Sequence, residues 1–516
     1  MTNSGNGPGN VRFLLRDKVI LLSPGDNVAV ARHDLRPGFE LTGPEGIIPV
    51  RDEISAGHKV ALCAIPANSR ITKYAHIIGE ARRLIQPGEW VHTHNIRPVQ
   101  DPDRHGPAAD RPAPPEFDAA LPRTFLGYRR PDGSVGTRNY IAIVATGSCS
   151  SHVCGAIASE FGRVRADGFD GVVAIPHAEG CGHHEGSDTR QLERTLKGII
   201  VSPNVGAVIV VALGCEENRL SKYRFVQDVG YGRPAALLEI QNIGGTLKTI
   251  SEGVRKTGEM IEVVRNLRRA EESVEHLRVG LNCGGSDAFS GISANPALGY
   301  ASDLIIAAGG TSVLAETPEI FGAEQLLTRR AVDSNTGTKL VRFVRRYQEY
   351  AEGFGATTES NPSQGNLAGG ISNILEKSLG PVMKGGITML ANAVDYAEPV
   401  RGTGLVFMNT PSYDPVSLTG LAAGGVNVIA FTTGRGTAIG SPVVPVLKIS
   451  SNTPVFLTMH DNIDLNAGDI IDGSSDIREK GTEIYRHLLR VASGELTKSE
   501  LLGHHEFVPW RIGPVM

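Results

Sequence analysis

The sequence has few aromatic residues, few cysteines for its length and no long apolar run. Aromatic side chains make up 5% of the 516 residues, and there are six cysteines. Six cysteines in a chain this long do not form a disulfide scaffold. No uninterrupted apolar stretch reaches the roughly 18 residues of a membrane-spanning helix, and the polar start MTNSGNGPGN lacks a signal-peptide core. These absences predict a protein of the reducing cytoplasm with no membrane span and with free thiols.

An excess of positive charge and the common nucleotide-binding motifs are also missing. The chain has 51 basic and 55 acidic residues, a formal net charge of −4, which argues against nucleic acid as a partner. Neither GxGxxG nor GxxxxGK[ST] occurs, so we expect no nucleotide cofactor. Glycine is abundant at 62 residues, and many glycines with few aromatics suit an α/β enzyme with tight strand-to-helix turns.

The order of strand-like and helix-like segments predicts three domains and a linker. Residues 11–100 contain short alternating runs separated by PGD, RPG and QPG, which is typical of a small all-β domain. Residues 101–122 are rich in Pro, Ala and Asp and predict a linker. From Phe125 onward strand-like and helix-like runs alternate, which predicts a body with Rossmann-like parallel sheets: an α/β domain over 123–278 and a C-terminal α/β domain over 279–516.

Within that body the pattern predicts specific elements. Residues 188–200 and 246–277 are helix-like, whereas residues 302–316, 404–411 and 426–436 look like strands that end in Gly-rich turns. No fixed-period repeat is present, so a solenoid is not expected.

Four cysteines stand where an apolar strand-like run ends in a Gly-rich turn: Cys149, Cys181, Cys215 and Cys283. In an open α/β sheet that end of a strand is where ligands bind. A single such cysteine is usually a small buried hydrophobe. Four of them favour a soft-ligand metal site or a thiol-bearing active site, and the alternative is four packed strand-end cysteines.

Histidines strengthen the metal hypothesis at two places. The block PHAEGCGHHEGSD, which contains His183 and His184, is the densest group of potential ligands in the chain, and it matches no zinc-finger spacing. A catalytic metal with ligands from separate loops fits it better than a structural zinc. His92 and His94 are two residues apart, so on a strand they would face the same side and could share a metal or an anion; the alternative is a pair of surface histidines.

Basic side chains near these blocks could bind a carboxylate. Lys73 could do so, or act as a base if burial lowered its pKa, although a solvated surface lysine is the simpler interpretation. Arg138 and Asn139 precede the strand that ends at Cys149, and a guanidinium can pair with a carboxylate through two parallel hydrogen bonds.

Further polar residues stand beside glycines in the second half of the chain. They include Ser286, Asp287, Asn361, Lys377 and Arg435. This pattern suggests a site for a small, oxygen-rich ligand; for each residue alone, a capped turn or a surface ion pair is the alternative.

These blocks together resemble the altronate/galactarate dehydratase family from about Val11 to Asp472. The matching stretches include GYRRPDGSVGTRNY, CGGSDAFSGISANPALGYASD, NPSQGNLAGGISNILEKSLG and FTTGRGT. The sequence of these stretches resembles the galactarate type more than the altronate type. The resemblance implies an N-terminal β-clip (SAF-type) domain, a larger α/β body and iron-dependent loss of water from a sugar acid. A similar body occurs in sulfolactate sulfo-lyases, in which sulfite leaves instead.

We therefore expect a metal-dependent hydro-lyase that converts a hexarate or hexonate, such as galactarate or altronate, to a 2-keto-3-deoxy acid by β-elimination. Fe²⁺ is the expected cofactor, with Mn²⁺ or an iron–sulfur cluster as alternatives. The alternative functions are a sulfo-lyase and a non-catalytic sugar-acid-binding protein. We expect a homodimer whose only other partner is the sugar acid.

Each candidate residue has an expected role. The candidate bases are His183, His184 and Lys73. The candidate metal ligands are His92, His94, Cys149, Cys181 and Cys283. The candidate substrate-binding residues are Arg138, Asn139, Ser286, Asp287, Asn361, Lys377 and Arg435.

Overall fold

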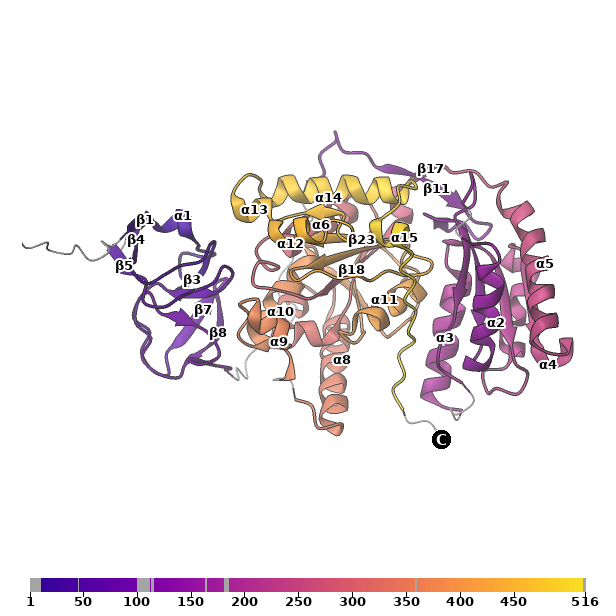
Figure 1. Ribbon diagram of the computed structural model, residues 1–516, viewed down its shortest axis with the longest axis horizontal. Coiled ribbons are helices and arrows are strands. Elements are labelled where there is room, and N and C mark those ends of the chain that lie inside the picture. Colours follow the sequence, from indigo (N-terminus) through magenta and orange to yellow (C-terminus); the bar gives the residue numbers. More distant parts are fainter. Residues whose placement is uncertain are drawn as a thin grey trace, which may run out of the picture.

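The computed structural model describes residues 11–44, 46–99, 112, 116–162, 165–180, 185–357 and 360–513. Most of the predicted linker 101–122 therefore lies outside the described residues. In Figure 1 a β-rich N-terminal unit lies at one end of the molecule, the C-terminal unit lies in the middle, and the unit that comes second in the sequence lies at the far end.

The N-terminal unit is built from short strands in three small sheets, which agrees with the predicted all-β composition. The sheets have the orders β1-β4-β5, β2-β3-β6-β9 and β10-β8-β7. One short helix, α1 (Leu15–Lys18), interrupts them. The strands are β1 (Val11–Leu14), β2 (Val19–Ile20), β3 (Val28–Ala31), β4 (Phe39–Gly43), β5 (Gly46–Pro49), β6 (Lys59–Ala61), β7 (Arg70–Lys73), β8 (His76–Ala81), β9 (Trp90–Val91) and β10 (Ile96–Arg97).

The second unit contains a parallel sheet with the order β14-β13-β15-β16. Successive side chains of a strand face opposite sides, so Ile141 and Ile143 of β13 pack with α2 and α5 residues, while Ala142 and Val144 pack with α3 residues. The elements are β13 (Tyr140–Ala145), α2 (Ser148–Ser159), β14 (Gly171–Ile175), α3 (Ser187–Val201), β15 (Val205–Ala212), β16 (Ala235–Glu239), α4 (Ile240–Ile243) and α5 (Thr246–Val264).

A three-stranded antiparallel sheet, β12-β11-β17, borders the second unit. Its strands are β11 (Thr124–Arg129), β12 (Val135–Gly136) and β17 (Ala270–Ser273). The helix expected over 246–277 is therefore wrong at its end, because α5 stops at Val264 and the chain then forms β17. The residues of β17 pair with Thr124–Gly127, a long-range pairing that a local pattern does not reveal.

The C-terminal unit is a seven-stranded parallel sheet with the order β20-β21-β19-β18-β22-β23-β24. Its strands are β18 (Arg278–Gly284), β19 (Thr311–Leu314), β20 (Leu390–Val394), β21 (Gly404–Met408), β22 (Val428–Thr433), β23 (Val446–Ser450) and β24 (Leu465–Asn466). Its longer helices are α6 (Ala294–Ala307), α8 (Ser334–Gly353), α10 (Ile374–Val382), α11 (Asp414–Ala423) and α14 (Ile477–Ala492). The shorter ones are η4 (Thr317–Ile320), a 3₁₀ helix, and α7 (Gln325–Thr328), α9 (Gln364–Ala368), α12 (Thr453–Thr458), α13 (Asp469–Asp472) and α15 (Lys498–Leu502).

One predicted strand is wrong in its first half. Residues 302–307 form the end of α6, and the strand begins only at Thr311. The apolar run in this segment is compatible with either a buried helix or a buried strand, and α6 is buried along most of its length.

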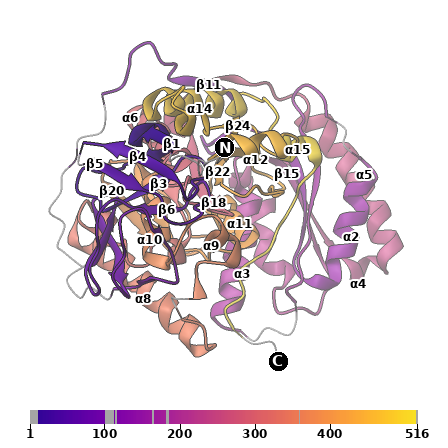
Figure 2. The same cartoon turned by 60° about the vertical axis from the view of Figure 1, so that its left-hand side comes forward.

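Two parallel sheets with helices confirm an α/β body, whereas its Rossmann-like character and the exact domain boundaries stay predictions. Figure 2 shows the N-terminal unit in front of the C-terminal unit, near α9 and α10. Buried contacts join them there: Lys59 of β6 and Lys73 of β7 both bond to Glu376 of α10. In the ranges that the structure describes, no helix is long and apolar enough to cross a membrane.

Candidate active site

A cleft of about 620 Å³ opens at the carboxyl edge of the seven-stranded sheet. Cys283 and the turn Gly284–Ser286 line it from the end of β18, Glu319 from η4, Lys377 from α10, and Asp414 from the start of α11. Because β18, β19 and β21 are parallel, the segments after their carboxyl ends meet at one edge of the sheet, where ligands bind in open α/β folds. We call this cavity the sheet-edge cleft.

The turn after β18 lets two segments approach closely. Gly285 has φ +60°, in the left-handed region that glycine adopts without strain. A Cβ atom on Gly284 would collide with the carboxylate of Asp414. The two glycines therefore allow the Asp414 side chain to lie directly over the end of β18.

A buried ion pair lies beneath this turn. Glu316 accepts hydrogen bonds at Oε2 from the Cys283 backbone N–H, over 2.9 Å, and from Lys384 Nζ, over 3.1 Å. Glu316 has φ +77°, an uncommon value for a residue with a side chain, and strained backbone of this kind is concentrated at functional sites. Burial raises the pKa of the Cys283 thiol well above its usual value, and Glu316 adds to the effect, so the thiol is held protonated.

Lys377 connects two acceptors at the wall of the cleft. Its Nζ donates to Asn361 Oδ1 over 2.7 Å and lies 3.0 Å from Glu319 Oε1. An ammonium carries three N–H groups, so one is left for a ligand. Glu319 Oε2 is buried and has no hydrogen-bond partner among the described residues. A buried carboxylate oxygen without a partner is uncommon in folded proteins, and a molecule bound in the cleft can supply the missing hydrogen bond.

Asp414 has the opposite chemistry. Burial raises its pKa to about 8, and the neighbouring carboxylates of Glu316 and Glu319 add to this shift. At neutral pH the side chain is therefore a neutral acid that can donate a proton. The sheet-edge cleft thus holds one carboxyl group that can give a proton and one with a free acceptor oxygen.

The structure brings together some of the predicted residues and leaves others out. Cys283, Ser286, Asn361 and Lys377 line the sheet-edge cleft, while Asp287 and Arg435 are not among its lining residues. Asp287 lies within the turn and accepts hydrogen bonds from Ser290, Ser451 and Asn452. Arg435 is exposed, and its backbone N–H donates to Gly285 O over 2.8 Å. Both residues therefore support the shape of the turn.

Lys73, a predicted base, is a structural residue. Its Nζ donates to Glu376 Oε1 over 2.8 Å, and Lys59 Nζ donates to Glu376 Oε2 over 2.9 Å. Burial alone would lower the pKa of Lys73, but the Glu376 carboxylate outweighs it and raises this pKa above its usual value. A lysine held in its protonated form cannot accept a proton.

Arg138 and Asn139, predicted to bind substrate, are likewise structural. The Arg138 guanidinium is fully buried, and all five of its N–H groups are used: two on Glu500 and three on backbone carbonyls. The Asn139 side chain bonds to Arg130, Gly168 and Val264. No donor of Arg138 is left for a substrate carboxylate.

His92 and His94 do not share one face of a strand, because β9 ends at Val91. Both rings contact Trp90, with ring centroids 5.1 and 5.0 Å from the indole. His92 is buried and its Nε2 bonds to Leu367 O of α9 over 3.1 Å, whereas His94 is exposed. The pair is therefore not arranged as two ligands of one metal.

Three of the four cysteines lie in the described residues, at or just after the end of a strand, but they belong to two different sheets. Cys149 and Cys215 are exposed and follow β13 and β15, which are neighbours in the four-stranded sheet. Cys283 is buried at the end of β18 in the other sheet. Cys181, His183 and His184 lie outside the described residues.

A metal site is not formed by the part of the chain that the structure describes. There, no group of three or more His, Cys, Asp or Glu side chains is placed to hold a metal ion. The described candidate ligands therefore do not fit a shared Fe²⁺ site. Fe²⁺ stays a prediction.

Glu319 and Asp414 belong to the Pro-containing blocks AETPEIFG and NTPSYDP, whose polar residues suggested a small, oxygen-rich ligand, but the sequence pattern assigned neither residue a role as acid or base. Glu319 lies in η4, shortly after β19, and Asp414 begins α11, shortly after β21. This position after a strand is the signal that had been applied to the cysteines, and it applies equally to the carboxylates.

Comparison with family models identifies three consecutive parts of the chain. Residues 17–98 match "Altronate/galactarate dehydratase SAF domain", residues 127–265 match "D-galactarate dehydratase/Altronate hydrolase, second domain", and residues 274–515 match "D-galactarate/Altronate dehydratase, C-terminal".

Individual proteins are similar over most of the chain. Altronate dehydratase of Bacillus subtilis is 36% identical over 498 residues, 95% of this chain and 97% of the relative. Galactarate dehydratase (L-threo-forming) of Escherichia coli is 34% identical over 506 residues, 95% and 96% of the two chains. The (2R)-sulfolactate sulfo-lyase subunit beta of Chromohalobacter salexigens is 34% identical over 394 residues, 76% of this chain and 98% of the relative.

Proposed function

Because the chain belongs to the altronate/galactarate dehydratase family, we propose that it removes water from a sugar acid held in the sheet-edge cleft. The family and the enzyme class, a hydro-lyase, match the predictions from the sequence. We choose this cleft as the site because two carboxyl groups of different chemistry line it. The pKa of Asp414 is raised to about 8, and Glu319 has a carboxylate oxygen without a hydrogen-bond partner among the described residues.

Substrate binding uses the polar wall of the cleft. The N–H of Lys377 that is not used by Asn361 or Glu319 donates to the carboxylate of the sugar acid. Ser286, in the turn after β18, offers a hydroxyl group for a substrate hydroxyl or carboxylate oxygen. These contacts orient the carbon next to the carboxylate toward Glu319, which lies 3.0 Å from Lys377.

The reaction is a β-elimination between these two carboxyl groups. Glu319 Oε2 takes the proton from the carbon next to the carboxylate, and the electron pair of that C–H bond forms a C=C bond. The C–O bond at the next carbon breaks, and Asp414 gives its proton to the departing hydroxyl, which leaves as water. The enol then gains a proton at the third carbon and loses the proton of its hydroxyl group, which gives a 2-keto-3-deoxy acid. Positioned acid and base groups of this kind contribute about 10²–10⁴-fold each to a rate.

The cofactor, two of the predicted bases, the oligomeric state and the location in the cell remain predictions from the sequence. Fe²⁺, with Mn²⁺ or an iron–sulfur cluster as alternatives, stays the predicted cofactor. His183 and His184 remain predicted bases that lie outside the described residues. The homodimer and the cytoplasmic location also stay predictions.

A sulfo-lyase reaction is the second candidate function. The sulfo-lyase subunit is similar to 76% of this chain, whereas the two dehydratases are each similar to 95% of it. The N-terminal β unit, which matches the dehydratase SAF model, therefore favours water over sulfite as the leaving group.

The test is an activity panel on anaerobic protein supplied with Fe(II) and thiol. The substrates are galactarate, glucarate, altronate and sulfolactate, with detection of 2-keto product and of sulfite. We expect a 2-keto product from one sugar acid and no sulfite. Sulfite from sulfolactate would assign the sulfo-lyase reaction instead, and no turnover of any of the four would contradict the proposed substrate class.

A further inference from the structure

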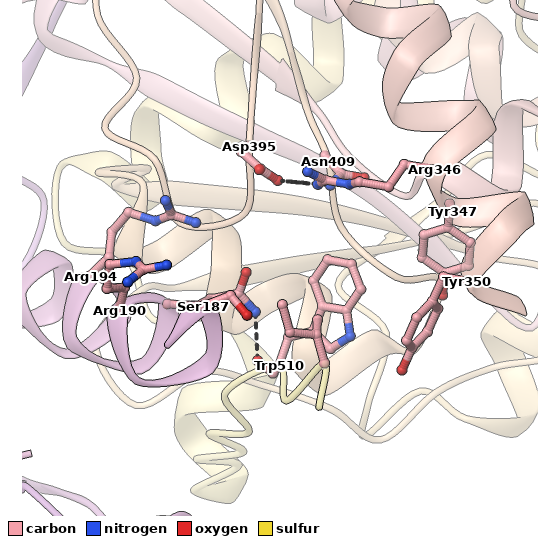
Figure 3. Close-up of a pocket in the computed structure, with 11 residues that line it drawn as sticks. Ser187, Arg190, Arg194, Arg346, Tyr347, Tyr350, Asp395, Asn409 and Trp510 are labelled. Atoms are coloured by element: carbon pink, nitrogen blue, oxygen red, sulfur yellow. Dashed lines mark hydrogen bonds and ion pairs between the residues drawn. The ribbon is translucent and has the colours of Figure 1, made fainter. Parts of the chain in front are cut away.

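A second cavity lies between the second unit and the C-terminal unit. Its volume is about 410 Å³. Figure 3 shows Arg190 and Arg194 on the α3 side and Arg346, Tyr347 and Tyr350 on the α8 side, with Trp510 of the C-terminal segment between them. We call it the interdomain pocket and define it by these six residues. It contains none of the carboxyl groups proposed for catalysis.

The interdomain pocket is lined by more guanidinium groups than carboxylates. Arg190 and Arg194 are four residues apart on α3, so their side chains share one face of the helix. Neither forms an ion pair within the described ranges, and the Nε of Arg194 is buried without a hydrogen-bond partner there. Arg346 is different, because its Nη2 lies 2.8 Å from Asp395 Oδ1. Three guanidinium groups thus face one carboxylate.

An aromatic wall completes the interdomain pocket. The Trp510 ring centroid lies 5.9 Å from that of Tyr347 and 6.3 Å from that of Tyr350. Gln191 donates from Nε2 to Trp510 O over 2.6 Å. Two residues later, the Ile512 N–H donates to Asp188 Oδ1 over 2.7 Å. The C-terminal segment is therefore fixed to α3 before any ligand binds, and fixed walls reduce the cost of ordering on binding.

We propose that the interdomain pocket binds a small dianion with a planar or ring-shaped face, in addition to the sugar acid in the sheet-edge cleft. Guanidinium groups pair with phosphate or carboxylate oxygens through parallel hydrogen bonds, and aromatic side chains stack on a planar ring. The excess of cationic over anionic side chains matches two negative charges. This inference does not depend on the proposed dehydratase reaction.

The pocket also adjoins the sheet-edge cleft. Tyr347 and Tyr350 line both cavities, so α8 forms a wall between them. A ligand in the interdomain pocket would therefore contact side chains that also face the substrate.

The test is isothermal titration of the full-length protein with three probes: phenyl phosphate, inorganic phosphate and galactarate. We expect phenyl phosphate to bind more tightly than inorganic phosphate, because only the former can stack on the aromatic wall. Loss of one charge-assisted hydrogen-bond donor costs about 1.5–3 kcal/mol, so Arg194→Gln is expected to weaken phenyl phosphate binding about tenfold or more. Binding is also expected to weaken with increasing salt.

Two controls make the result specific to this pocket. Arg345→Gln removes an exposed guanidinium from α8 that does not line the pocket, and it is expected to leave phenyl phosphate binding unchanged. Unchanged melting temperatures show that the variants fold. Absence of phenyl phosphate binding, or equal binding by wild type and Arg194→Gln, overturns the proposal. Galactarate binding that is lost in Arg194→Gln, without phenyl phosphate binding, also overturns it and assigns the pocket to the substrate.

Discussion

Lys73 donates from Nζ to Oε1 of Glu376 over 2.8 Å, and both side chains are almost completely buried. The bond connects β7 of the N-terminal unit with α10, and Lys59 donates to the second oxygen of the same carboxylate. The residue after Glu376 is Lys377, which lines the sheet-edge cleft. The N-terminal unit therefore stabilises the helix that carries a proposed substrate-binding group.

Removal of this shared carboxylate should destabilise the protein strongly. Glu376→Gln leaves two buried ammonium groups without an anion, and loss of one member of a buried ionic group typically costs about 3–5 kcal/mol. The free energy of unfolding, measured by urea titration, is expected to fall by that amount. Lys73→Met is the matched control: it should cost less, since Lys59 still neutralises Glu376. Equal losses in both variants would contradict the shared arrangement.

Arg138→Ala tests whether the buried guanidinium binds substrate or stabilises the fold. The substitution leaves Glu500 buried without its cation, so the unfolding free energy should fall by about 3–5 kcal/mol. Below the melting temperature, KM for the sugar acid should stay at the wild-type value. A KM that rises tenfold or more in folded protein would instead show that Arg138 binds the substrate carboxylate.

The predicted iron can be assigned to one sheet or the other by substitution. Cys149 is exposed and follows β13, the neighbour of β15, whereas the buried Cys283 thiol interacts with the cationic Lys384, which disfavours a metal ion. After anaerobic loading, Cys149→Ser is therefore expected to lose iron content and Cys283→Ser to retain it. The buried Cys154→Ser is the control. Loss of iron in Cys283→Ser alone would place the metal at the seven-stranded sheet.

Glu319→Gln tests the proposed base. The amide keeps the shape of the side chain but cannot take a proton, so kcat is expected to fall about 10²–10⁴-fold. Lys377 keeps its bond to Asn361 in this variant, so KM should change little. Asn361→Ala is the comparison: it removes one of the two acceptors of Lys377 and should act mainly on KM. A Glu319→Gln enzyme with wild-type kcat would exclude this residue as the base.

Local sequence patterns predicted several strands of both parallel sheets, and long-range pairing explains one place where they failed. The apolar runs before Cys149, Cys215 and Cys283 are β13, β15 and β18, because a continuous apolar run bounded by Gly is typical of a buried parallel strand. The local pattern predicts a helix for the β17 residues, because their pairing with β11 joins segments that are far apart in the sequence, such as Thr124 and Ser273. Single-sequence periodicity contains no information on such a partner.

The candidate site was predictable in its position and only partly in its residues. Cys283, Ser286, Asn361 and Lys377 were expected to be near a ligand, and they line the sheet-edge cleft. Arg138 and Lys73 were chosen because Arg and Lys bind carboxylates, but the sequence does not show that Glu500 and Glu376 neutralise them. Residue type alone does not distinguish a binding cation from one in a buried ion pair.

The raised pKa of Asp414 also has a consequence for stability. The folded protein binds this proton up to about pH 8, whereas an unfolded aspartate releases it near pH 4. Its contribution to stability is therefore present at low pH and is lost as the pH rises toward 8. Asp414→Asn removes this dependence. As the pH rises from 5 to 8, the unfolding free energy of the variant is therefore expected to increase relative to that of the wild type. A constant difference over that range would contradict the raised pKa.

The proposed elimination at the sheet-edge cleft is tested by the pH dependence of kcat/KM for wild type and Asp414→Asn, measured on the sugar acid that the activity panel identifies. If Asp414 protonates the leaving hydroxyl, wild-type kcat/KM falls as the pH passes about 8, because the acid is then ionised. Asp414→Asn is expected to lose about 10²–10⁴-fold in kcat and to lack that fall. A variant with wild-type kcat and the same pH profile would show that water is not lost at the sheet-edge cleft by this acid.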